Sequence, residues 1–183
     1  MADTTTGATT GRSRLVTGLF RDRDSAESAY GSLTTRGYSK DDVNLMMSDK
    51  TRDTYFKDDK TSGDSDLGDK AWEDAGKGAA IGGTVGATLA AIAAIGTSVA
   101  LPGIGLLVAG PLAAGIAGAG AGGLTGGLIG ALIGSGIPED RAKEYEKGIN
   151  EGGILMGVNA RSDEDAEYFE NDWRTNRGEG VYR

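Results

Sequence analysis

The residues from Gly78 to Pro138, GAAIGGTVGATLAAIAAIGTSVALPGIGLLVAGPLAAGIAGAGAGGLTGGLIGALIGSGIP, carry no charged and no aromatic side chain, although charged residues crowd both flanks. The three prolines of the protein, at positions 102, 111 and 138, divide this stretch into two apolar runs, 79–100 and 112–133. Small residues recur at every fourth position in both runs, which is the spacing of a glycine zipper. We therefore expect a helical hairpin over residues 78–137, with a short uncharged tip from Leu101 to Pro111.

The four-residue spacing predicts where the two helices make their closest contacts. Glycine inside an exposed helix costs about 1 kcal/mol relative to alanine, so this density of glycine needs compensation. Small residues at i and i+4 line one face of a helix and let a neighbouring helix approach closely. The expected helix-packing or oligomer interface consists of Gly78, Gly82, Gly86, Ala90, Ala94, Gly118, Gly122, Gly126, Gly130 and Gly134. Bulky residues lie on the opposite side, with Leu124, Leu128 and Leu132 opposite Gly122, Gly126 and Gly130.

The bulky faces need an apolar cover, which is either lipid or protein. A run of 22 residues would span about 33 Å as a helix, and a bilayer core is about 30 Å thick. The insertion signal is marginal, because most of each run is Gly, Ala and Thr rather than Leu, Ile or Val. The rest of the chain shows no second large apolar surface, so self-association is the alternative cover. Membrane insertion, a soluble homo-oligomer and a folded-back monomer all stay open.

Composition narrows the classes of function. The chain has a net charge of −8, which disfavours a basic patch for nucleic acid. It has neither Cys nor His, which excludes disulfides, the usual zinc sites and histidine acid–base catalysis. A G-x-G-x-x-G match that begins at Gly118 lacks a preceding strand, so no cofactor site is predicted. Acidic clusters near Glu139 and Asp163 suit first helical turns better than a metal, and we expect no metal, no catalytic residue and no enzyme activity.

The sequence before the glycine-rich stretch has the pattern of one half of a small α+β domain. Residues 1–13 are expected to be a disordered tail, residues 14–56 a first half-domain and residues 57–77 a charged linker. Within the half-domain, Leu15 to Phe20 reads as a strand, followed by a helix capped by Asp24 and ended by Gly37. Asp42 to Met47 predicts a second strand, and Ser48 or Asp49 caps a short helical turn that ends at Phe56.

Residues 138–183 repeat this order after an additional helix. Pro138 starts that helix, which Gly152 and Gly153 end, and Ile154 to Ala160 is the next predicted strand. Asp163 caps the last helix, and Gly180 to Arg183 can form a short edge strand. Two βαβ-like halves of this kind predict a ferredoxin-like sheet with strand order 4-1-3-2 and its helices on one face, interrupted by the glycine-zipper hairpin.

Several segments resemble the bacterial general stress proteins of the heat-induced type. The first is Val43-Asn44-Leu45-Met46-Met47-Ser48-Asp49-Lys50-Thr51-Arg52 with the aromatic pair Tyr55-Phe56. The others are Gly136-Ile137-Pro138-Glu139-Asp140, Tyr145-Glu146 and Gly152-Gly153-Ile154-Leu155, so the resemblance covers Arg14 to Trp173. It implies a stress-linked protein with membrane association and no defined activity, and it supplies no catalytic residues.

Three classes of function therefore remain. The first is a cytoplasmic, non-enzymatic stress protein that self-associates through the hairpin and inserts in or binds the membrane through residues 79–133. The second is a soluble homo-oligomeric ring, filament or shell with the hairpins in its interior. The third is a small-ligand sensor on the open face of the sheet, for which the sequence offers no polar constellation and no identifiable substrate. The expected partners are a second copy of the chain or a lipid bilayer.

Overall fold

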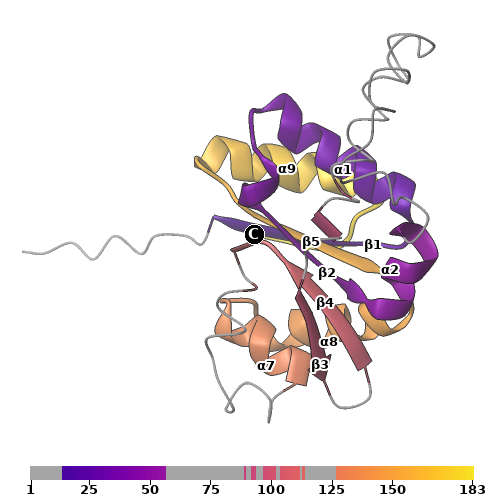
Figure 1. Cartoon of the computed structure of the whole chain (residues 1–183). Helices are drawn as coiled ribbons and strands as arrows, with labels where there is room; N and C mark the ends of the chain where they lie inside the picture. The colour runs from indigo at the N-terminus through magenta and orange to yellow at the C-terminus, as the bar shows by residue number, and fades with distance from the viewer. Residues whose placement is uncertain are drawn as a thin grey trace, which may run out of the picture.

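The computed structural model describes residues 14–56, 89, 92–93, 97–101, 104–111, 113 and 127–183. Their fold is α+β, with helices on both sides of one antiparallel sheet whose strand order is β3-β4-β2-β5-β1-β6 (Figure 1). The predicted tail 1–13 and linker 57–77 lie outside the described residues.

Four of the six strands come from the two predicted half-domains. They are β1 (Leu15–Phe20), β2 (Val43–Ser48), β5 (Ile154–Asn159) and β6 (Glu179–Tyr182). Their order in the sheet is β6-β1-β5-β2, which is the predicted order 4-1-3-2 and is compatible with a ferredoxin-like arrangement. The two halves also match in their helices, because α1 (Arg23–Thr35) and α9 (Asp163–Thr175) each have 13 residues.

The glycine-rich stretch contributes two strands, where the sequence analysis expected a helix and the short connection at the tip of a hairpin. Strand β3 (Thr97–Leu101) overlaps the predicted helical run 79–100, and β4 (Ile104–Ala109) occupies the predicted tip. The two strands pair antiparallel from Thr97↔Val108 to Leu101↔Ile104, and β4 pairs with β2. The helical prediction was wrong here because it treated Pro102 as a helix break, whereas the Pro102-Gly103 dipeptide in the sequence is a turn signal. Helix is described at Leu89, Ile92 and Ala93 of the first run and from Gly127 to Gly134 (α7), which ends one residue beyond the second run.

The sheet is covered on both faces, which corrects the prediction that the helices lie on one face. Helices α1 and α9 pack on one face, and α7 and α8 (Glu139–Asn150) pack on the other (Figure 1). Strand β2 shows the alternation that divides the two cores: Val43, Leu45 and Met47 face α1 and α9, while Met46 faces α7 and α8. The second face is the large apolar surface that the sequence analysis did not find, and it covers Leu128 and Leu132 of α7.

Local signals place most helix ends within two residues of the prediction. The N-cap of α1 is Asp22 rather than Asp24, because Asp22 has the extended backbone that a cap requires and its Oδ1 accepts from Ser25 N at 2.8 Å. Likewise Ser162, not Asp163, caps α9 by accepting from Asp165 N at 3.0 Å. The short helix α2 (Asp49–Phe56) begins at the predicted Ser48 cap, whose Oγ accepts from Thr51 N at 3.1 Å.

Candidate functional sites

The outer face of α7 is the first candidate site. Leu128 and Leu132 are 1% and 0% exposed and pack on the sheet, as members of the second core. Gly130 and Gly134 lie about 180° around the helix from them. No described atom lies within 4 Å of the position that a Cβ would take at either glycine. Beside them lies Ile133, which is 43% exposed. Among the described residues it is the one large hydrophobic residue that is exposed. The face is therefore smooth, apolar and open.

Only two of the ten predicted interface residues can be placed in this way. Gly130 and Gly134 belong to α7, with the bulky residues opposite them as predicted. The other eight lie outside the described residues: Gly78, Gly82, Gly86, Ala90, Ala94, Gly118, Gly122 and Gly126. Among the residues that the structure does describe, no helix has the length and apolar character needed to cross a bilayer.

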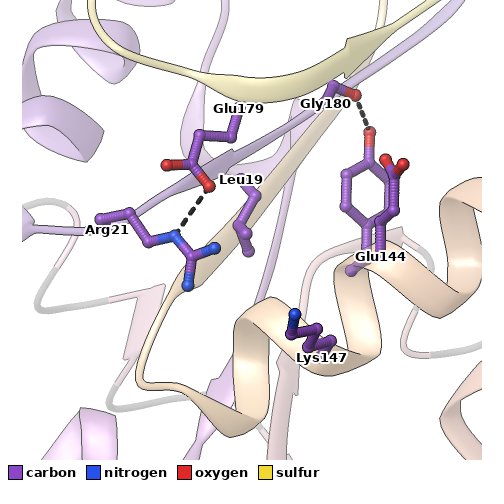
Figure 2. Close-up of a pocket in the computed structure, with 7 residues that line it drawn as sticks. Leu19, Arg21, Glu144, Lys147, Glu179 and Gly180 are labelled. Carbon is purple, nitrogen blue, oxygen red and sulfur yellow. Dashed lines mark hydrogen bonds and ion pairs between the residues drawn. The ribbon is translucent and has the colours of Figure 1, made fainter.

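The second candidate site is a pocket of about 200 Å³ between β1, β6 and α8. Its lining is shown in Figure 2 and consists of Leu19, Arg21, Glu144, Tyr145, Lys147, Glu179 and Gly180. Arg21, just beyond the end of β1, donates from Nε to Glu179 and from an Nη to Glu151, both at 2.7 Å. These two bonds raise the pKa of Arg21, and the bond from Arg21 lowers the pKa of Glu151. Arg21 is therefore a fixed cation at one side of the pocket.

Tyr145 connects the pocket wall to the second core. Its hydroxyl donates to the carbonyl of Gly180 at 2.6 Å and lies 2.9 Å from Oγ1 of Thr17. Burial raises the pKa of Tyr145 to about 12, so the phenol keeps its proton at neutral pH. Gly180 has a φ of 58°, a backbone conformation that side chains with a Cβ rarely adopt. The hydrogen bond from Tyr145 thus holds β6 at a position where the strand needs glycine.

A second pocket, also of about 200 Å³, shares Arg21 with the first. It is lined by Arg21, Ser48, Lys50, Thr51, Thr54, Tyr55, Asn150, Glu151 and Gly152. Ser48 and Thr51 are buried, and their hydroxyl oxygens lie 2.7 Å apart, so they bond to each other rather than point at a ligand. This pocket is polar, but the groups deepest in it are already satisfied.

The acidic first turns discussed above are engaged in ion pairs. Glu139 pairs with Lys143 and Glu144 with Arg141, at 2.7 and 2.6 Å. Asp165 accepts from Arg36 and from the hydroxyl of Tyr38, and these bonds lower its pKa. Across the described part of the chain, no group of three or more acidic side chains has the arrangement that would hold a metal ion.

The pocket residues were missed in the sequence because their chemistry depends on tertiary structure. Glu151 and Glu179 lie 130 and 158 positions after Arg21 in the sequence. None of the three residues belongs to a local motif. Tyr145 is only 1% exposed, and its two hydroxyl contacts also depend on residues distant in the sequence.

Comparison with known proteins identifies no relative. Neither the family models, nor the curated proteins, nor the solved structures give a match to this chain.

Proposed function

We propose that this protein is a non-enzymatic general stress protein that self-associates through the glycine face of α7. The observation that carries the proposal is the division of α7 into two faces. The leucine face packs on the protein's own sheet, while Gly130, Ile133 and Gly134 face outward with room for another helix. Glycines at this spacing let two helix backbones approach closely, so a second copy of α7 is the occupant that fits.

The stress-protein part of the proposal rests on the resemblance from Arg14 to Trp173. The proposed architecture is a ferredoxin-like module, formed by β1, β2, β5, β6, α1 and α9, into which the glycine-rich segment is inserted. The strand order β6-β1-β5-β2 supports that architecture.

Association with a membrane is the second candidate, since Ile133 is exposed within a stretch that has no charge. The packing of α7 limits this candidate. Leu128 and Leu132 are occupied by the sheet, so α7 offers lipid only its outer face. A soluble assembly and a membrane-bound one therefore use the same surface, and they differ in what covers it.

Leucine at Gly130 or at Gly134 tests the proposal. Each change places a bulky side chain where the partner backbone would lie, and overpacking of this kind costs about 1 to 3 kcal/mol. Helix propensity alone predicts the opposite effect, a more stable helix, because leucine is a better helix former than glycine by roughly 0.8 kcal/mol. We expect Gly130→Leu and Gly134→Leu to keep the fold by circular dichroism and to lose the associated species in sedimentation velocity.

Lys143→Leu is the matched control, because it adds the same side chain to an exposed position of the neighbouring helix α8. It should leave association unchanged. Unchanged assembly of both glycine variants would contradict the proposal, and so would equal loss in the control. Co-sedimentation with phosphatidylcholine vesicles of the wild-type chain and of Gly130→Leu separates the lipid-bound form from the self-associated one.

A further inference from the structure

Strand β3 forms one end of the sheet. The strand order begins with β3, and within the described residues this strand pairs with β4 alone. In an antiparallel pair, every second residue of a strand exchanges its N–H and C=O bonds with the neighbouring strand. The backbone groups of the other residues of β3 therefore point away from the sheet, where a further strand can bind them.

The two ends of the sheet differ in how well they can accept another strand. At the opposite end, β6 contains Glu179 and Gly180, whose φ is 58°, and its pairing with β1 shifts register between Thr17 and Leu19. Charges and irregularities of this kind keep an edge from pairing with another chain. Strand β3 has the sequence TSVAL, without charge, glycine or proline, and all five of its residues pair with β4 in one register. Of the two ends, β3 is therefore the better suited to a partner strand.

The distribution of charge favours a second copy of the chain as the partner. The chain has a net charge of −8, but residues 78–138, which include β3, carry no charge. Two copies therefore repel each other least when they meet at this stretch. With a two-fold axis at Val99, two β3 strands run antiparallel and Ser98 of each lies opposite Ala100 of the other, so no like charges face each other. A second β3 is thus complementary to the first.

We propose that β3 pairs antiparallel with β3 of a second copy, and that this contact joins dimers linked through α7 into larger assemblies. It rests on the proposed self-association through α7, because a contact between two five-residue strands is too small to hold two chains together by itself. A dimer linked through α7 has two β3 edges, so two such dimers can make two edge contacts at once. One chain can make both kinds of contact, since α7 packs on a face of the sheet and β3 lies at its end.

Oxidative crosslinking of the full chain tests the register, because the chain has no cysteine of its own. Residues directly opposite in an antiparallel pair have Cα atoms about 4.5 to 5.5 Å apart, within the range of about 4.4 to 6.8 Å that a disulfide takes. Val99→Cys should therefore give a disulfide-linked dimer on a non-reducing gel. Ser98→Cys is the matched control and should stay uncrosslinked, because its two copies lie diagonally, with Cβ atoms about 7 to 8 Å apart. Absence of the Val99→Cys dimer, or equal crosslinking of both variants, would overturn the proposal.

Sedimentation velocity separates the edge contact from the α7 contact. Ser98→Lys places like charges across the paired edges, so it should keep the dimer and lose every larger species of the wild type. Ser28→Lys makes the same substitution at an exposed position of α1 and should change nothing. Circular dichroism checks the fold of both variants. Larger species that persist in Ser98→Lys, or a wild-type chain that stops at the dimer, would overturn the edge contact alone. Assembly that persists in Gly130→Leu would instead overturn the α7 contact.

Discussion

The two faces of the sheet are covered by helices of different origin and composition. On one face, α1 and α9 bring together the large aromatic side chains Tyr30, Phe169 and Trp173, all at most 1% exposed. On the other face, α7 and α8 contribute leucine, isoleucine, alanine and a single aromatic residue, Tyr145. Both cores contain residues of the two half-domains, but only the first face is covered by the matching helices α1 and α9. The second face is covered by the additional helix α8 and by α7 of the glycine-rich stretch.

The difference shows that the glycine-rich stretch is part of the fold rather than an appendage. Its residues occur in both cores: Leu107 and Ala109 face α1 and α9, whereas Leu106 and Val108 face α7 and α8. Strand β4 also covers the edge of β2, which is otherwise the end of the four-stranded sheet. Both cores of the half-domains therefore include side chains of this stretch.

Replacement of residues 76–136 by a short Gly/Ser linker should have the largest effect. It removes nine buried side chains of the described cores: Leu89, Ile92, Ala93, Leu106, Leu107, Val108, Ala109, Leu128 and Leu132. Burial of a large aliphatic side chain contributes about 1.5 to 3 kcal/mol, so the loss approaches the whole stability of about 5 to 15 kcal/mol. We expect no cooperative thermal transition by circular dichroism.

Deletion of residues 2–13 serves as the control, because this segment has no large apolar side chain to contribute to a core. It should leave the transition unchanged. A linker variant that melts cooperatively near the wild-type temperature would show that the first face alone supports the fold.

The two faces also differ in how far the sequence predicts them. The strands and helices of the first face were predicted because strand residues alternate and Ala26, Ala29, Tyr30 and Leu33 recur at helical spacing. In the glycine-rich stretch the four-residue spacing of small residues continues through Ser98, which lies in β3. The spacing of small residues alone does not distinguish a helix from a strand. Here the strand conformation of β3 and β4 depends on the pairing of β4 with β2 and of β3 with β4, which the local sequence does not encode. The Arg21 pocket depends on contacts across more than 100 positions, so no local pattern predicts it.

Single truncations compare the two faces more finely. Trp173→Ala removes a fully buried indole that packs edge-on against Phe20 and donates to the carbonyl of Ala29 at 3.3 Å. Leu132→Ala removes a fully buried side chain of the second face. We expect losses in the free energy of unfolding of about 3 to 5 kcal/mol for Trp173→Ala and about 2 to 5 kcal/mol for Leu132→Ala, measured by urea denaturation. A loss below about 1 kcal/mol for Leu132→Ala would mean that α7 contributes little to the core.

Alanine at two glycines on the second face gives the smallest effects, with opposite signs. At Gly148 a Cβ would stand 2.1 Å from a methyl carbon of the buried Leu19, so Gly148→Ala should lower the free energy of unfolding by about 1 to 3 kcal/mol. Both glycines are helical, so alanine increases the helix propensity at each. At Gly130 no described atom lies within 4 Å of the position that a Cβ would take, so no steric clash offsets this gain. Gly130→Ala should therefore raise the free energy of unfolding by up to about 1 kcal/mol. The measurement is urea denaturation at a protein concentration below that of self-association, since a partner helix at Gly130 would add a cost that the monomer does not have. If Gly130→Ala destabilised the monomer, the outer face of α7 would be packed within the chain, and the surface proposed for self-association would not be available.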